Sequence, residues 1–328
     1  MKKLLSAGLC LSMFLLAGCQ GQPQDTTLTI TDQAGREVTF EEPCQTAASG
    51  YYITTTIMIG LQQQDKLTGI EMKPETRPIY AKAAEEILDL PQLGNKKMFN
   101  VEECAKSDPD VVFLPVSLES YVEELEALDI PVVLLEPETA DDFEEAVEII
   151  GKVMGCEDKV DEYKQYEEDL LEKYELDEVE EEPTVYFAGS DLLTCATDDM
   201  YQGEILSYAQ ADNAIDAEGS SWVNIDIETL LAANPDYVFI EAGSLSADDF
   251  KNDARVQELQ AVQNDHVYVF PSTLETWDTP SLSSCLGKLW AASILHPELV
   301  SMDDVEAESV AFYEQFYGFT PEAQDLAL

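Results

Sequence analysis

Histidine and basic residues are scarce in this chain of 328 residues. It has two histidines, His266 and His296, and its 17 Lys and Arg residues face 67 Asp and Glu residues. Two histidines cannot form a three-histidine zinc site, and the chain has no Gly-x-Ser-x-Gly nucleophile motif. We therefore expect no catalytic residues, no bound metal and no cofactor.

The shortage of positive charge also excludes a class of partner. The formal net charge is −50 at pH 7, and only Arg36, Arg77 and Arg255 carry a guanidinium. Such a surface repels the phosphates of nucleic acids, so no nucleic-acid partner is expected. The hydrophobic fraction of 45% is ordinary for a globular protein and argues against disorder.

The cysteines do not follow any metal-binding spacing. Beyond the first nineteen residues they are Cys44, Cys104, Cys156, Cys195 and Cys285, an odd number whose pairing the sequence leaves open. Cys104 lies on the apolar side of a predicted helix, so we expect it to be a core thiol.

The N-terminus has the features of an export signal. Two lysines precede a mostly apolar stretch, residues 4–16, which is too short to span a membrane comfortably. It ends in Leu16-Ala17-Gly18-Cys19, which resembles the bacterial lipobox. We expect residues 1–18 to be a lipoprotein signal peptide, Cys19 to carry the lipid, and residues 19–27 to form a tether. The protein would then be exported and lipid-anchored to the cell membrane, at its outer face or in the periplasm.

One pattern of fourteen residues occurs twice. Residues 101–114 recur as residues 227–240, with glutamate in second place and Pro-Asp seven residues later. Ile227, Leu230 and Leu231 form one apolar helical face, and Pro235 disfavours helical geometry in the residue before it. An unbroken apolar run of strand length follows, as in a strand covered on both faces. Each copy therefore predicts a helix that leads into a buried strand.

The duplication organises the whole chain. Strands alternate with helices on both sides of a long stretch, residues 141–178, which has almost no strand pattern. We expect an α/β protein with two Rossmann-like lobes, each with a central, mostly parallel sheet, joined by a single long α-helix. The expected boundaries are an N-terminal lobe at 28–155, a linking helix at 156–182 and a C-terminal lobe at 183–328. Late helices are expected at 256–262, 281–295 (amphipathic) and 305–316.

These features together resemble a family. They are the lipobox, the Asp32-x-x-Gly35-Arg36-x-Val38 hairpin, the two Glu–Pro-Asp repeats and the long central helix. The chain is similar to the class III substrate-binding proteins of ABC importers, which bind ferric siderophores, haem, cobalamin and some oxyanions. The resemblance implies a monomer that works with a membrane permease and its ATPase. It also implies that Glu102 and Glu228 dock to arginines of that permease; a favourable charge at a helix N-terminus is the alternative role.

The resemblance further implies a ligand between the lobes, on loops at strand ends. Trp222 and Trp277 fall in predicted loops and are expected to wall the ligand, whereas Trp290 lies in an apolar helix and is expected in the core. Paired lysines in a loop are more often merely solvated. The full expected set is Tyr51, Tyr52, Lys96, Lys97 and Met98 from the first lobe, and Ser190, Asp191, Tyr201, Ser221, Trp222, Trp277 and Asp278 from the second.

Two ligand classes remain open at this stage. A metal chelate (ferric siderophore, cobalamin or haem) comes first, and the scarcity of arginine favours a neutral or cationic one. A molybdate or tungstate oxyanion, held by backbone N–H groups and hydroxyls, is the alternative. A cavity of several hundred Å³ walled by the two tryptophans would favour the chelate, and a small closed cavity the oxyanion. An exported enzyme and a purely structural lipoprotein are disfavoured.

Overall fold

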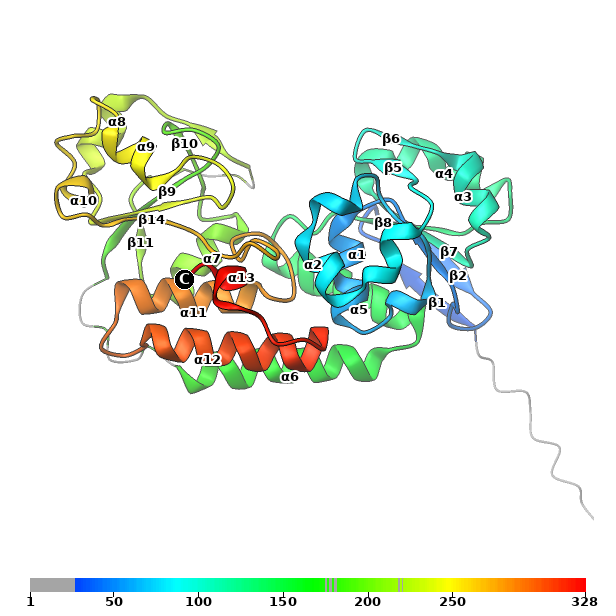
Figure 1. Ribbon diagram of the computed structural model, residues 1–328. Coiled ribbons are helices and arrows are strands. Elements are labelled where there is room, and N and C mark those ends of the chain that lie inside the picture. Colours follow the sequence, from blue (N-terminus) through cyan, green and yellow to red (C-terminus); the bar gives the residue numbers. More distant parts are fainter. Residues whose placement is uncertain (1–26, 175, 177–178, 180–181, 218, 220) are drawn as a thin grey trace, which may run out of the picture.

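The computed structural model describes residues 27–328, apart from 175, 177–178, 180–181, 218 and 220. Two α/β lobes stand side by side above a layer of long helices (Figure 1). The predicted signal peptide, Cys19 and nearly all of the tether lie outside the described residues. None of the helices in the described part is long and apolar enough to cross a membrane.

The N-terminal lobe is built on a parallel sheet of four strands, as predicted. The strand order is β4-β3-β7-β8, and an antiparallel hairpin, β1–β2, lies beside it. The strands are β1 (Leu28–Thr31), β2 (Glu37–Phe40), β3 (Ala47–Ser49), β4 (Leu67–Gly69), β5 (Gly94–Asn95), β6 (Met98–Phe99), β7 (Val111–Pro115) and β8 (Val132–Leu135). The helices are α1 (Tyr52–Gly60), α2 (Pro78–Ala83), α3 (Val101–Ser107), α4 (Val122–Glu126) and α5 (Ala140–Met154), with short 3₁₀ turns at Gln64–Lys66, Pro74–Thr76, Glu85–Asp89 and Val116–Tyr121.

The C-terminal lobe has a mixed sheet. Its order is β12-β10-β9-β13-β14, with β11 also paired to β9; β13 is parallel to β9 and β14, and β10 is antiparallel to its neighbours. The strands are β9 (Thr184–Ala188), β10 (Thr194–Cys195), β11 (Asp212–Asn213), β12 (Val223–Asn224), β13 (Tyr237–Ile240) and β14 (Val267–Val269). The helices are α7 (Tyr201–Tyr208), α8 (Ile227–Ala233), α9 (Ala247–Asn252), α10 (Gln260–Gln263), α11 (Ser284–Leu295), α12 (Met302–Phe312) and α13 (Ala323–Leu326), with a π-helical turn at Tyr313–Tyr317.

The two sequence repeats fold alike. Each forms a helix, α3 or α8, that ends in a left-handed residue, Asp108 or Asn234, before a buried strand. The aspartate of each Pro-Asp pair then ties this strand to the first strand of its own sheet. Asp110 Oδ2 accepts the backbone N–H of Thr46 at 2.9 Å, and Asp236 Oδ2 accepts that of Thr184 at 3.0 Å. An equivalent hydrogen bond therefore lies at the beginning of the central strand pair in each lobe.

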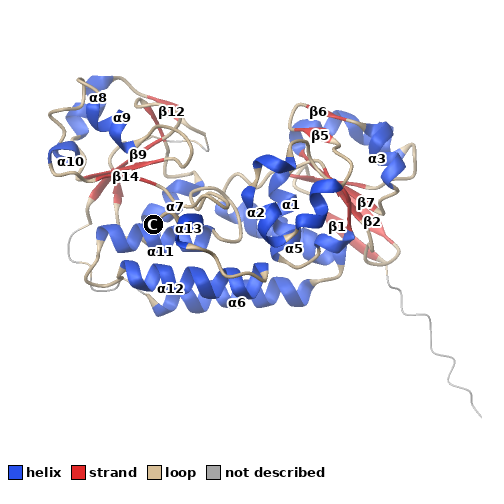
Figure 2. Ribbon diagram, viewed as in Figure 1, coloured by secondary structure: helices blue, strands red, loops and turns tan. Residues whose placement is uncertain are grey.

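Helix α6 (Glu157–Lys173) runs beneath both lobes, alongside α12, and lies within the range predicted for the linking helix (Figures 1 and 2). Tyr166 contacts the rings of Phe312 and Phe316, with centroids 5.7 and 5.2 Å apart. The linking helix is therefore also part of the core of the C-terminal half.

Two of the late helices differ from the sequence prediction. The prediction that α11 is amphipathic is wrong: all its residues except Ile294 are buried, because α6, α7 and α12 pack around it. Of the helix expected at 256–262, only α10 forms. Trp290 is buried in α11 as predicted.

The lobes also touch each other directly. Ile79 in α2 donates its backbone N–H to the carbonyl of Leu274 at 3.3 Å, and Lys82 pairs with Asp325 at 2.9 Å. At the end of α1, a Cβ on Gly60 would lie 2.8 Å from Leu282 Cδ2 and 3.3 Å from the Tyr317 hydroxyl. The two lobes are thus packed at the base of the space between them as well as joined through α6.

Replacing Gly60 with valine is expected to push this contact apart. We expect Gly60→Val to destabilise the protein by about 1–3 kcal/mol, because the added methyl groups overpack the interface. Thermal unfolding measures the effect. Ala81→Val, at an exposed position of α2, is the control and should change stability by less than about 0.5 kcal/mol. Equal stability of Gly60→Val and the wild type would show that the lobes are not closely packed there.

Candidate ligand-binding cleft

The loops that follow the strands of both lobes converge on the space between them. Tyr52 comes after β3, and the segment 70–77 comes after β4. On the other side, Glu241 follows β13 and the segment 271–281 follows β14. Ligands of open α/β sheets bind at the carboxyl ends of the strands, so these loops are where a ligand is expected.

A cavity of about 220 Å³ lies between the lobes at this place. Its lining is rich in hydroxyl groups and includes a guanidinium and a carboxyl group. The lining residues are Tyr52, Thr56, Thr76, Arg77, Pro78 and Ile79 from the first lobe, and Ser272, Thr273, Leu274, Glu275, Thr276, Thr279, Pro280 and Ser281 from the second.

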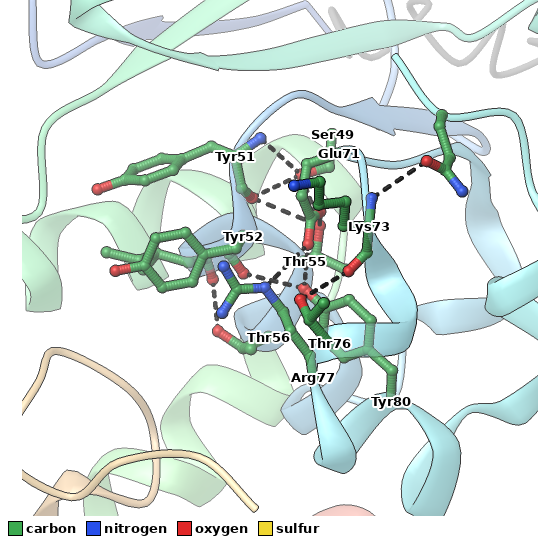
Figure 3. Close-up of polar contacts among 12 residues, drawn as sticks. Ser49, Tyr51, Tyr52, Thr55, Thr56, Glu71, Lys73, Thr76, Arg77 and Tyr80 are labelled. Atoms are coloured by element: carbon green, nitrogen blue, oxygen red, sulfur yellow. Dashed lines mark hydrogen bonds and ion pairs between the residues drawn. The ribbon is translucent and has the colours of Figure 1, made fainter. Parts of the chain in front are cut away.

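Aromatic rings and cations form the wall on the N-terminal side. The guanidinium of Arg77 lies over the ring of Tyr52, 3.9 Å from its centroid (Figure 3). Tyr51 and Tyr52 meet edge to face with centroids 5.4 Å apart, and the ammonium of Lys96 is 4.9 Å from the Tyr51 ring. Each cation is attracted to the negative face of a ring, which holds the side chains in place.

A buried carboxylate, Glu71, organises this wall from behind (Figure 3). Its Oε1 accepts the hydroxyl of Tyr80 at 2.7 Å and pairs with Nε of Arg77 at 3.3 Å. Its Oε2 accepts the hydroxyl of Thr55 at 2.7 Å, and the same hydroxyl oxygen lies 2.8 Å from the hydroxyl oxygen of Ser49. Glu71 therefore fixes the guanidinium that covers Tyr52.

Acidic groups from both lobes lie near this wall. Burial raises the pKa of Tyr52, and the nearby carboxyl groups of Glu138, Glu241 and Asp278 raise it further. Burial, together with the neighbouring Glu241, raises the pKa of Asp278 to about 7, against the backbone N–H of Ala242, which lowers it. This N–H donates to Asp278 Oδ2 at 2.9 Å, while Oδ1 has no hydrogen-bond partner among the described residues. Two carboxyl groups of the C-terminal lobe, Glu241 and Asp278, thus lie near Tyr52 behind the cavity lining, and the charge of Asp278 changes near neutral pH.

The structure brings some of the residues expected at the site together. Tyr51, Tyr52 and Lys96 form one group beside Arg77, and Asp278 lies close enough to Tyr52 to affect its pKa. Of these, Tyr52 and Arg77 line the cavity between the lobes.

Trp277 needs a correction. It lies in a loop, as predicted, but its side chain is fully buried and its indole N–H donates to the hydroxyl of Tyr313 at 3.1 Å. A ligand in the cleft cannot reach it in this conformation. Loop position alone does not show whether a side chain points outward or into the core. Here the side chain of Trp277 packs in the core of the C-terminal lobe.

Other expected residues lie away from the cavity. Trp222 packs across the backbone of Gly189, where a Cβ would come within 2.6 Å of its ring. Tyr201 is buried, bonds to Ser284, and borders a different hollow of about 350 Å³ between α5, α6, α7 and α11. Met98 borders a third hollow beside Glu102. The remaining four, Lys97, Ser190, Asp191 and Ser221, are exposed and do not line the cavity.

Several residues of the cleft were missed by the sequence analysis. Glu71, Glu241 and Glu275 are among 67 acidic residues, and nothing in the sequence distinguishes them. Thr55 and Thr56 could have been noticed, because threonine is uncommon inside an apolar helix unless its hydroxyl has a partner.

A larger hollow, of about 900 Å³, lies between the start of α5 and α7. It has several carboxylates and no aromatic side chain, and most of its lining lies in α7 and the loops beside it rather than at strand ends. We therefore place the site in the smaller cavity. The five cysteines in the described residues are free thiols and all are buried, Cys104 in the core as predicted. Within the described residues, no three His, Cys, Asp or Glu side chains are grouped as a metal site requires.

Two α/β lobes that share one cleft define a solute-binding protein of the ABC-transporter type. The model of the periplasmic binding protein family matches residues 48–274, and the chain belongs to this family. It is therefore an extracytoplasmic, non-enzymatic component of an ABC transporter.

One of the similar proteins carries its ligand in its name. The molybdate-binding protein MolA of Haemophilus influenzae is 23% identical over 317 residues, 88% of this chain and 90% of MolA. Its structure with molybdate has a TM-score of 0.76 at 22% identity, over 90% of this chain and 99% of that one. A periplasmic solute-binding protein of Veillonella parvula has a TM-score of 0.79 at 20% identity, over 92% and 97% of the two chains. At these identities the structures share the fold.

Removing the charge of Glu71 is expected to loosen the cleft wall. We expect Glu71→Gln to cost about 1–3 kcal/mol, because an amide cannot accept from Tyr80, Arg77 and Thr55 together. Urea unfolding measures it. Glu75→Gln, in the exposed turn that precedes Arg77, is the matched control and should be neutral within about 0.5 kcal/mol. A Glu71→Gln variant as stable as the control would mean that the wall does not depend on this carboxylate.

Proposed function

We propose that this protein is the substrate-binding lipoprotein of an ABC importer that captures a neutral or cationic metal chelate, such as a ferric siderophore, cobalamin or haem. The chelate binds between the lobes, against Tyr52 and Arg77, and is delivered to a membrane permease and its ATPase. The protein acts as a monomer and is held at the membrane by lipid on Cys19, which lies outside the described residues.

The observation that carries the chelate proposal is the charge of the cleft. Arg77 is already paired with Glu71, and Lys96 lies 3.6 Å from Glu138. Glu241 and Asp278 do not line the cavity, but both lie close enough to Tyr52 to raise its pKa, and neither has an ion-pair partner among the described residues. An anion would enter this surplus of carboxyl groups at an energetic cost, whereas a neutral or cationic chelate would not. The flat ring of Tyr52 offers apolar contact area for such a ligand.

A molybdate or tungstate oxyanion is the second candidate. The small volume of the cavity and its many hydroxyl groups favour it, as does the absence of both predicted tryptophans from the lining. The similarity to the molybdate-binding protein of Haemophilus influenzae supports it as well. The guanidinium of Arg77 would be the nearest cation.

The docking surface is proposed at Glu102 and Glu228. Both occupy the second position of their helices, α3 and α8, which lie on the side of the molecule opposite α6 (Figure 1). The side chain of Glu102 is 83% exposed and pairs with Lys106, 2.9 Å away, and Glu103 lies beside the same lysine. Two exposed carboxylates on one face can meet two permease arginines at once.

The ligand class determines how binding depends on pH. The carboxyl group of Asp278, with a pKa of about 7, is mostly neutral below that pH and ionised above it. A cationic chelate should therefore bind about threefold to tenfold more tightly at about pH 8 than at about pH 6, and molybdate more weakly. Tryptophan fluorescence during titration with a cationic ferric chelate, cobalamin, haemin and molybdate measures both.

Asp278→Asn is the control for this experiment, because an amide keeps the shape and does not titrate. It should flatten the pH profile of whichever ligand binds. Binding of molybdate alone, weakening as pH rises, would select the second candidate. A profile that is identical in the wild type and in Asp278→Asn would show that this carboxyl group does not act on the ligand.

Loss of both docking glutamates should uncouple the protein from its permease. We expect the double variant Glu102→Ala/Glu228→Ala to stimulate ATP hydrolysis by the reconstituted permease at least about tenfold less, since charge pairs across an interface are lost. Its thermal unfolding should be unchanged. The control Glu123→Ala/Asp248→Ala removes two exposed carboxylates from the first turns of α4 and α9. Undiminished ATP hydrolysis with the first variant would refute the docking role.

A further inference from the structure

We propose that each lobe meets the permease through a mixed patch of one glutamate and one exposed apolar side chain. The N-terminal patch is Glu102 with Met98, and the C-terminal patch is Glu228 with Leu231. The inference rests on the proposed function and adds contacts beyond the glutamates. It also defines the partner surface: at each patch the permease presents a cation with an apolar side chain next to it.

The N-terminal patch has a hollow that an apolar side chain can enter. Met98 in β6 is 59% exposed, and it lines a hollow of about 480 Å³ together with Glu102. The floor is apolar: Phe99 and Val101 are buried beneath it, and the ring of Tyr121 packs edge-on against Phe99 at 6.1 Å. The resemblance had implied that Met98 touches the solute, but its position is beside the docking glutamate and outside the cavity between the lobes.

The C-terminal patch repeats this chemistry on the matching helix. Leu231 is 38% exposed and lies three residues after Glu228, so the two side chains share one face of α8. Helices α3 and α8 are on the same side of the molecule (Figure 1). The large apolar side chains exposed among the described residues are Met98, Leu128, Leu231, Leu299 and Leu328. Two of these, Met98 and Leu231, therefore lie next to the two glutamates.

Charge indicates what covers these patches. Glu124 borders the same hollow as Glu102, and the chain as a whole carries a net charge of −50, so a basic surface is complementary. An exposed ion pair by itself contributes little, because water screens it. Apolar contact beside the pair excludes that water, and this arrangement is typical of the strongest positions in protein interfaces. A permease surface with arginines set among apolar side chains meets both requirements.

The test measures binding of the ligand-free protein to the permease–ATPase complex in lipid nanodiscs. Met98→Ser and Leu231→Ser should each raise the protein concentration for half-maximal binding about tenfold. Leu128→Ser and Leu299→Ser are matched controls: these leucines are 51% and 36% exposed, one in each lobe, and lie outside both patches. They should stay within about twofold of the wild type.

The outcomes separate this inference from the docking role itself. If Met98→Ser and Leu231→Ser bind like the wild type while Glu102→Ala/Glu228→Ala does not, the apolar contacts are refuted and the glutamates stand. If the double glutamate variant also binds normally, the docking role falls as well. The thermal midpoint of Met98→Ser with molybdate or a ferric siderophore must shift as in the wild type. Loss of that shift would make Met98 a ligand contact and overturn the N-terminal patch.

Discussion

The cleft depends on the close contact between the end of α1 and the C-terminal lobe. Gly60 leaves room for Leu282 and Tyr317, and this contact sets how near the two lobes come. Because α1 begins at Tyr52, the same helix that touches the other lobe at its end presents the ligand wall at its start. A change in that packing would therefore alter the distance between Tyr52 and the acidic loop of the opposite lobe.

The carboxyl groups on the two sides of the cleft differ in how their charge is balanced. On the N-terminal side a buried carboxylate, Glu71, is fully engaged and holds Arg77 flat on an aromatic ring. On the C-terminal side Asp278 is buried with one oxygen unpaired, and its pKa rises to about 7. The first wall is a rigid support, since every acceptor is used. On the second side, the protonation state of Asp278 can change: an approaching cation would favour the ionised carboxylate, and an approaching anion would favour the neutral acid.

The repeat also explains why the proposed docking surface and the proposed ligand site are separate. In both copies the glutamate lies at the start of a helix, α3 or α8, while the strand that follows leads toward the loops around the cleft. One supersecondary unit thus carries an exposed carboxylate at the start of its helix, apart from the carboxyl end of its strand. Met98 shows the same separation, because the short hairpin β5–β6 places Lys96 near Tyr51 but Met98 beside Glu102.

The amino-acid sequence by itself determined the α/β class, the two lobes and the repeated helix–strand unit, because these follow from local periodicity and from Pro-Asp at helix ends. The family resemblance put Tyr51, Tyr52 and Lys96 among the expected ligand residues, and the structure brings these three together. Only the tertiary structure decided that Trp277 belongs to the core, that Glu71 supports Arg77, and that Glu241 and Asp278 face Tyr52. The interaction of Tyr52 with Glu241 and Asp278 joins residues far apart in the chain, and the other two depend on which of many similar side chains is buried. Neither is encoded in local spacing.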